Sequence, residues 1–126
     1  MKHILVVDDQ ADMQELLRSA LELASPHYAV QTVGSAEAAL PLLRQKAFDL
    51  LITDMRLTGM NGLELARQVR AKRPQMPVIM VTAEPLDPKR PEIKAVGLFR
   101  LLKKPVDTDK LLTAVEAALP EKARGS

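Results

Sequence analysis

Two kinds of hydrophobic pattern alternate along the chain. Short runs rich in Val, Ile and Leu indicate strands at 4–7, 29–33, 50–53, 78–82 and 98–102. The first, third and fourth runs contain aliphatic residues with little polar alternation. Such runs are typical of strands that are buried on both faces of a parallel sheet.

Amphipathic helices are predicted between these runs. Apolar residues recur at helical spacing at 12–24, in a segment after Ser35, at 61–72 and in a segment after Asp107. Asp12 and Glu15 have the spacing of a capping box, so Asp12 is expected to cap the first helix. Asn61 and Asp107 are expected to cap the third and the last. Strand and helix alternate five times, which predicts an α/β fold with helices on both faces of a parallel sheet.

Prolines disturb two of the helical segments. The segment expected to hold the fourth helix, 84–94, contains Pro85, Pro88 and Pro91. A proline inside a helix removes an N–H group and clashes with the preceding turn, at a cost of about 3 kcal/mol or more. A short helix could begin at Pro91, after an irregular loop. Pro41 lies inside the second helical pattern and is expected to kink or shorten that helix.

Length and composition restrict the class of protein. The chain has 126 residues, which fits one domain, and a formal net charge of +2. Basic and acidic residues are interspersed, which argues against a dedicated nucleic-acid surface. No apolar run approaches the ~20 residues that a membrane span needs. The chain has no Cys, and its first apolar run ends in Asp8 and Asp9, unlike a signal peptide, so a cytoplasmic protein is expected.

Residues with metal-binding or catalytic chemistry lie at the carboxyl ends of the predicted strands. They are Asp8 and Asp9 after the first strand, Asp54 after the third, Thr82 at the end of the fourth, and Lys103, Lys104 and Pro105 after the fifth. In an open α/β sheet, ligands bind outside this edge. Three carboxylates, one hydroxyl and at least one ammonium group are therefore expected to converge there.

This set of groups suits the phosphorylation of one aspartate. Three neighbouring carboxylates repel one another unless a cation is present, and a small cluster of hard oxygen ligands suits Mg²⁺. A carboxylate can also act as a nucleophile and form an aspartyl phosphate. Phosphoryl transfer needs positive charge and hydrogen bonds around the transferred group, which Mg²⁺, Lys104 and the Thr82 hydroxyl could supply.

Four short motifs resemble those of a known family. They are Val-Val-Asp-Asp-Gln at 6–10, Leu-Leu-Ile-Thr-Asp-Met at 50–55, Met-Val-Thr-Ala at 80–83 and Lys-Pro at 104–105. In this order and spacing they resemble the receiver domains of two-component response regulators, over roughly residues 2–119. Each motif alone is weak, but four in order, each at a predicted strand end, are specific.

The resemblance implies a flavodoxin-like, doubly wound (βα)5 three-layer sandwich. Its five parallel strands would have the order 2-1-3-4-5. The prolines imply that its fourth helix is shortened or irregular. The receiver domain is expected to span residues 1–119, and residues 120–126 are expected to be a tail or the start of a linker.

The resemblance also implies a role for each matching acidic residue. Asp54 is the expected phosphoacceptor. Asp8, Asp9 and Asp54 are the expected Mg²⁺ ligands, together with the backbone carbonyl of Arg56. A histidine kinase, a phosphotransfer protein or a small phosphodonor is expected to supply the phosphoryl group.

Thr82 and Lys104 are expected to act on the phosphoryl group. In the family, a hydroxyl at the position of Thr82 hydrogen-bonds the phosphoryl oxygens, and a lysine at the position of Lys104 pairs with the phosphoacceptor. The peptide bond between Lys104 and Pro105 is expected to be cis, which would aim the lysine inward. Gly59 and Gly62 are expected to let the loop after the phosphoacceptor turn tightly.

Two departures from the family concern the switch and the mouth of the site. Receivers usually carry an aromatic residue at the position that Leu101 has here. Phe99 is expected to share a face of the strand with Leu101, without taking its position. Arg56 and Glu84 lie two residues after the phosphoacceptor and the threonine, and they are expected to pair across the mouth and shield the phosphate from water.

The sequence therefore predicts a signalling domain rather than an enzyme that turns over an external substrate. Phosphorylation is expected to change a surface that a downstream protein recognises, or that contacts a C-terminal output domain missing from this chain. The chain by itself is expected to bind neither nucleic acid nor membrane. The sequence also allows a weak homodimer.

Three alternatives use the same fold or the same residues. A phosphorylation-independent interaction module is favoured by Leu101 and the prolines, and disfavoured by the complete acidic site. A small phosphatase or nucleotide-binding enzyme is disfavoured, since no Gly-rich loop follows the first strand and no second acid lies two residues after Asp54. A DNA-binding regulator would need a second domain, because nothing in the chain indicates a helix-turn-helix module.

Overall fold

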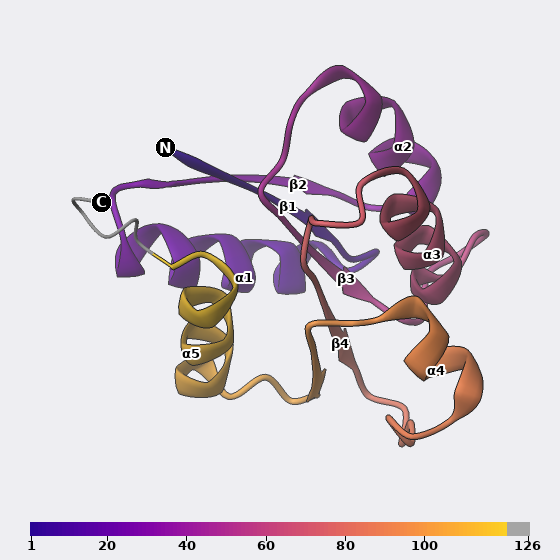
Figure 1. Ribbon diagram of the computed structural model, residues 1–126. Coiled ribbons are helices and arrows are strands. Elements are labelled where there is room, and N and C mark those ends of the chain that lie inside the picture. Colours follow the sequence, from indigo (N-terminus) through magenta and orange to yellow (C-terminus); the bar gives the residue numbers. More distant parts are fainter. Residues whose placement is uncertain (121–126) are drawn as a thin grey trace.

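A five-stranded parallel sheet forms the centre of the molecule (Figure 1). The computed structural model describes residues 1–120, so the tail predicted at 120–126 lies outside the described residues except for Pro120. The strands are β1 (Lys2–Val7), β2 (Tyr28–Val33), β3 (Leu50–Asp54), β4 (Val78–Thr82) and β5 (Arg100–Lys103). Their order is β2-β1-β3-β4-β5, and every pair of neighbours is parallel, which confirms the predicted topology.

Helices cover both faces of the sheet and make it the middle of three layers. They are α1 (Ala11–Ala24), α2 (Ala36–Gln45), α3 (Gly62–Lys72), α4 (Pro91–Val96) and α5 (Thr108–Ala118). Figure 1 shows α1 and α5 on one face and α2, α3 and α4 on the other. The flavodoxin-like sandwich is therefore confirmed. Within residues 1–120, none of the helices has both the length and the apolar character that a membrane crossing requires.

The sheet divides the apolar core into two clusters. In β1, Leu5 and Val7 pack on the side of α2, α3 and α4, whereas Ile4 and Val6 pack on the side of α1 and α5. β3 and β4 are buried along their whole length. Their sequences are nearly continuous in aliphatic residues because both of their faces are covered by helices.

Polar side chains cap α2, α3 and α5. Those of Ser35, Asn61 and Asp107 each accept a hydrogen bond from the backbone N–H group three residues further on. The caps predicted at Asn61 and Asp107 are thus confirmed. The cap predicted at Asp12 is wrong, since the N-cap of α1 is Gln10, without a side-chain hydrogen bond. Because α1 begins before Asp12, this carboxylate lies in the first turn, at the positive end of the helix dipole.

The two proline-containing helices behave differently. α4 has only six residues and begins at Pro91, which confirms the predicted shortening of the fourth helix. The segment before it, with Pro85 and Pro88, has no regular secondary structure. Pro41 lies inside α2, which continues past it to Gln45, so this helix does not end at the proline.

The last strand is shorter than its hydrophobic pattern. β5 begins at Arg100, two residues after the predicted start. Phe99 precedes the strand and packs with the cluster of α1 and α5, whereas Leu101 packs with the opposite cluster. The prediction that the two side chains share a face is therefore wrong, because the alternation of a strand applies only from Arg100 onward.

Candidate functional site

The carboxyl ends of β1, β3 and β4 lie side by side at one edge of the sheet. In the register of the sheet, Asp54 lies beside Val81, the residue before Thr82. Asp8 follows β1, which pairs with the other side of β3. The strand order therefore gathers Asp8, Asp54 and Thr82 at the edge where the sequence predicts a site.

Three carboxylates form a tight cluster at this edge. Oxygen atoms of Asp8, Asp9 and Asp54 all lie within 4.8 Å of one another. Asp8 and Asp54 are 1% and 7% exposed, whereas Asp9 is exposed to solvent. These are hard oxygen donors with one side open to water. Such a donor set fits Mg²⁺, which keeps several waters and takes one or two carboxylates from a protein.

Lys104 connects the end of β5 to the two buried carboxylates. Its Nζ donates hydrogen bonds to Asp54 Oδ2 at 2.8 Å and to Asp8 Oδ2 at 3.1 Å. Its backbone N–H donates to the carbonyl oxygen of Thr82 at 2.8 Å, which holds Lys104 beside the end of β4. The peptide bond between Lys104 and Pro105 is cis, as predicted.

The buried charges change each other's ionisation. Burial raises the pKa of the Asp8 carboxyl, because it outweighs the hydrogen bonds from the backbone N–H of Gln10 and from Lys104. Burial also acts to lower the pKa of the Lys104 ammonium, but the hydrogen bonds and charges of Asp54 and Asp8 outweigh it, and this pKa is raised. The lysine therefore stays charged at neutral pH, and a bound cation would favour the ionised form of Asp8.

Backbone N–H groups hold the second Asp54 oxygen and the Thr82 hydroxyl. The Arg56 N–H donates to Asp54 Oδ1 at 3.1 Å, and the Glu84 N–H donates to Thr82 Oγ1 at 3.0 Å. Asp8 accepts a hydrogen bond from the N–H two residues further on in the same way. Each of these strands thus ends in a turn that a polar side chain stabilises. The side chains of Asp54 and Thr82, at the last positions of β3 and β4, are thereby held in a fixed orientation.

An ion pair spans the mouth of the site. Arg56 Nη1 lies 2.8 Å from Glu84 Oε2 and links the loop after β3 to the loop after β4, as the sequence predicts. A hollow of about 360 Å³ opens beside this pair, lined by Asp9, Arg56, Glu84 and residues of the loop after β3. The hollow leaves the exposed carboxylate of Asp9 open to solvent on this side.

Glu37 contacts the loop after β3, which the sequence did not indicate. Its Oε2 accepts a hydrogen bond from the Met60 N–H at 2.9 Å. This hydrogen bond lowers the pKa of the Glu37 carboxyl. Gly59 has a φ of 84°, and a Cβ there would lie 2.7 Å from the same carboxylate oxygen. No local signal could have identified the contact, because it joins residues 23 positions apart on different elements.

Gly62 is needed because the backbone passes close to Asp54. A Cβ at Gly62 would lie 1.9 Å from the backbone carbonyl oxygen of Asp54. The Gly62 N–H donates to the Met55 carbonyl at 2.9 Å, so the start of α3 lies directly against the end of β3. Of the two glycines predicted to allow a tight turn, Gly59 supplies the positive φ, and Gly62 supplies the space for close packing.

Leu101 has the position where an aromatic residue is usual. It is half-buried and packs with the cluster on the side of α2, α3 and α4. Phe99 lies on the other side of the sheet, with the Arg100 guanidinium 4.5 Å from the centroid of its ring. Phe99 therefore does not replace the aromatic residue.

Comparison with known proteins agrees with this geometry. Residues 4–116 match the family described as the response regulator receiver domain. The chain belongs to this family. Its place in two-component signalling follows from that membership, and the site described above lies where the receiver motifs of the sequence meet.

The receiver domain is similar to parts of longer regulators. It is 37% identical over 121 residues to the transcriptional regulatory protein GlrR of Escherichia coli (strain K12). The aligned residues make up 96% of this chain and 27% of GlrR. It is 30% identical over 117 residues to the transcriptional regulatory protein FixJ of Bradyrhizobium diazoefficiens. The aligned residues make up 93% of this chain and 56% of FixJ. The chain therefore spans about a quarter and about half of the lengths of these two relatives.

Solved structures of receivers share the fold over nearly all of the chain. The chemotaxis response regulator CheY4 of Vibrio cholerae has a TM-score of 0.84 at 30% identity, covering 94% of this chain and 99% of its own. The response regulator TrrA of Thermotoga maritima, in complex with Mg²⁺ and BeF, has a TM-score of 0.82 at 31% identity, covering 94% of this chain and 100% of its own.

Proposed function

We propose that this receiver domain is phosphorylated on Asp54 in a Mg²⁺-dependent reaction. The main support is the position of the buried Asp54 carboxylate, 2.8 Å from the Lys104 ammonium and beside the carboxylates of Asp8 and Asp9. Phosphoryl transfer depends on positioning and on positive charge around the transferred group. A carboxylate between a fixed ammonium and an acidic cation site meets both requirements.

Asp8, Asp9 and Asp54 would hold the Mg²⁺ ion, together with the backbone carbonyl of Arg56. When bound, the ion would neutralise negative charge on the phosphoryl oxygens. The three carboxylates are hard oxygen donors that lie within 4.8 Å of one another. The solved complex of TrrA with Mg²⁺ and BeF supports the same ion here.

The transfer would be a displacement at phosphorus. A carboxylate oxygen of Asp54 forms a bond to phosphorus while the bond to the donor's nitrogen or oxygen breaks, and the donor keeps that electron pair. The product is an acyl phosphate on Asp54. Lys104 would orient the carboxylate before the transfer and pair with the phosphoryl oxygens after it. Pro105 follows Lys104 and would help to hold it at this edge.

Thr82 would pass the change on to the loop after β4. Its hydroxyl accepts the Glu84 N–H and has its own proton available for a phosphoryl oxygen. A shift of Thr82 toward the phosphoryl group would also move Glu84, which is paired with Arg56. Leu101 would move with Thr82. Its side chain is flexible and aliphatic, whereas most receivers have a rigid aromatic ring at this position. The outcome is a change in a protein-interaction surface.

The proposed phosphodonor is a histidine kinase or a phosphotransfer protein, acting in the cytoplasm. The proposed receiver of the signal is a downstream protein or an output domain of a longer regulator. The similarity to part of GlrR and FixJ, two transcriptional regulatory proteins, supports an output domain. A weak homodimer would be one form of the switched surface.

The test is phosphorylation by a small phosphodonor. The protein is incubated with acetyl phosphate and Mg²⁺, and its intact mass is measured. One added phosphoryl group is expected with Mg²⁺ and none with EDTA. The Asp54→Asn variant, which keeps the size of the side chain but loses the nucleophile, should give no adduct. A folded wild-type protein that gives no adduct under any condition would leave the phosphorylation-independent interaction module as the better account.

A further inference from the structure

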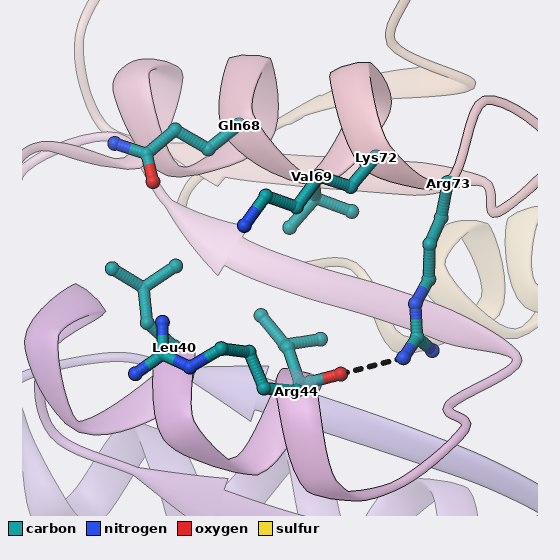
Figure 2. Close-up of a pocket in the computed structure, with 7 residues that line it drawn as sticks. Leu40, Arg44, Gln68, Val69, Lys72 and Arg73 are labelled. Carbon is teal, nitrogen blue, oxygen red and sulfur yellow. Dashed lines mark hydrogen bonds between the residues drawn. The ribbon is translucent and has the colours of Figure 1, made fainter.

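A groove between α2 and α3 takes no part in the proposed phosphorylation. Its volume is about 340 Å³. It is lined by Leu40, Leu43 and Arg44 on α2, by Gln68, Val69 and Lys72 on α3, and by Arg73 after α3 (Figure 2). None of these residues belongs to the acidic site.

The floor of the groove is apolar. Leu43 and Val69 belong to the core and are 7% and 5% exposed, and Leu40 beside them is half-buried. The volume lies at the lower end of the range for ligand-binding pockets, about 300–1,000 Å³, which also favour an apolar lining with a few polar groups. The groove can therefore take a few aliphatic side chains, but not a large ligand.

Two side chains on the rim of the groove carry unpaired positive charges. Arg44 and Lys72 are exposed, and neither has an ion pair or a side-chain hydrogen bond with any residue in the described part of the chain. Figure 2 shows that they extend from opposite helices toward the end of the groove where Leu40 and Gln68 lie. Both charges thus border the same apolar floor.

Arg73 differs from these two residues. Its Nη2 donates to the Leu43 carbonyl oxygen at 2.7 Å, the hydrogen bond drawn as a dashed line in Figure 2. Its Nη1 donates to the Lys46 carbonyl oxygen at 3.4 Å. The guanidinium therefore satisfies carbonyl groups at the carboxyl end of α2 and closes that end of the groove. The charges available to a partner are those of Arg44 and Lys72.

Among residues 1–120, no carboxylate lines the groove. At other positions an exposed arginine is paired with a nearby glutamate, as Arg18 is with Glu15 on α1 and Arg67 is with Glu64 on α3 itself. The groove therefore combines an apolar floor with uncompensated positive charge on both sides. A ligand that complements it needs an apolar ridge with negative charge on both flanks.

We propose that this groove docks an acidic amphipathic helix of a partner protein. A helix binds a groove through apolar anchors at positions i, i+3 or i+4, and i+7, which span about 10.5 Å. The ten residues of α2 form a wall about 15 Å long, which is sufficient for this set of anchors. Leucine-like anchors would fill the floor, and flanking Glu or Asp residues would pair with Arg44 and Lys72.

The test uses a synthetic peptide as the probe. It is a fluorescein-labelled helix of about 15 residues with three leucines at helical spacing and glutamates on both flanks of the leucine stripe. The control peptide carries lysines in place of the glutamates. Anisotropy measures binding to the wild type, to Arg44→Glu/Lys72→Glu, and to Lys89→Glu/Lys94→Glu, which makes the same change of charge at exposed positions near and in α4.

The acidic peptide is expected to bind the wild type and the Lys89→Glu/Lys94→Glu variant alike. It should bind Arg44→Glu/Lys72→Glu at least roughly tenfold more weakly, because each reversed charge replaces attraction by repulsion. The lysine peptide should show the opposite preference. Backbone amide shifts caused by the acidic peptide should be confined to α2, α3 and the residues that join them to the sheet.

Equal affinity of the wild type and Arg44→Glu/Lys72→Glu for the acidic peptide would overturn the proposal, as would peptide-induced shifts on α4 or α5. Concentration-dependent self-association that only Arg44→Glu/Lys72→Glu abolishes would also overturn it, since the occupant would then be a second copy of this chain. Thermal unfolding confirms that each variant is folded. The Asp54→Asn variant should bind the peptide as the wild type does, so failure of docking and failure of phosphorylation are distinguishable.

Discussion

The loops after β3 and β4 leave the same edge of the sheet but are held in different ways. The loop after β3 is tied to α2 and α3, through the hydrogen bonds of Met60 with Glu37 and of Gly62 with Met55. The loop after β4 is held mainly by hydrogen bonds among its own residues, such as Leu86 N–H to the Glu84 carbonyl. Its polar link to the other loop is the ion pair of Arg56 and Glu84 at the mouth of the site.

This difference suits the two tasks of a receiver domain. In the proposed function, the loop after β3 keeps the proposed phosphoacceptor and a proposed metal ligand in place through contacts with α2 and α3. The loop after β4 would respond to Thr82. Segments held by few contacts with other elements open at low cost in free energy. The prolines contribute to this by preventing a longer α4.

The largest effect is expected from Gly62→Ala. Its Cβ would lie 1.9 Å from the Asp54 carbonyl oxygen, so α3 must move away from β3. We expect a loss of about 3 kcal/mol in the free energy of unfolding, as for a severe overpacking change, and loss of the phosphoryl adduct. Urea unfolding and intact mass measure the two effects. Gly34→Ala is the control, since its Cβ would meet Gln14 at an ordinary 3.6 Å; a Gly62→Ala variant as stable as this control would contradict the prediction.

Gly59→Ala and Gly97→Ala compare the loop after β3 with the end of α4, which within residues 1–120 has no contact with the acidic site. Gly59 and Gly97 have φ of 84° and 76°, so each alanine should cost about 1–2 kcal/mol of stability for the left-handed backbone. Only Gly59→Ala also displaces the Glu37 carboxylate, and only it should slow phosphorylation by acetyl phosphate. Stopped-flow or quench measurements of the rate give the comparison. If both variants slowed phosphorylation equally, the tie to α2 would have no special role in positioning the site.

A smaller, pH-dependent effect is expected from Glu37→Ala. The Met60 N–H lowers the pKa of the Glu37 carboxyl below its ordinary value of 4.5. Ionised Glu37 therefore stabilises the fold above about that pH, and the contribution is lost as pH falls through the lower pKa of the folded state. The difference in unfolding free energy between wild type and variant should be present at pH 7 and shrink toward pH 3. A difference that grew on acidification would contradict this sign.

The smallest effect on stability is expected from removal of the ion pair. Arg56 and Glu84 side chains are 73% and 33% exposed, so Arg56→Ala and Glu84→Ala should change the unfolding free energy by only ~0–1 kcal/mol. The lifetime of the phosphorylated form should nevertheless shorten, since water gains access to the mouth of the site. The decay of the adduct after removal of acetyl phosphate measures this lifetime. An unchanged lifetime in both variants would show that the pair does not shield the phosphate.

Much of the fold was predictable from local patterns. The buried strands are continuous in aliphatic residues, and the caps at Asn61 and Asp107 lie directly before helical periodicity, so both could be recognised. The turns after the strands also carry their own signals, as at Asp54 and Thr82. The fit of the chain to the receiver motifs then supplied the strand order, which patterns of this length do not determine.

What the sequence did not reveal depends on contacts between distant segments. The tie between Glu37 and Met60 joins α2 to the loop after β3, which no local pattern relates. The position of Phe99 depended on where β5 begins, and pairing with β4 determines that point. The groove between α2 and α3 arises from the spacing of two helices on the sheet, which side-chain periodicity does not encode.

The central claim is that Asp54, and no other carboxylate of the cluster, takes the phosphoryl group. The direct measurement is to phosphorylate the protein with acetyl phosphate and Mg²⁺, reduce the acyl phosphate with borohydride, and locate the reduced residue by peptide mass spectrometry. Homoserine at position 54 alone is the predicted result. Homoserine at Asp8 or Asp9, or its absence from a folded protein that carries the adduct, would contradict the account.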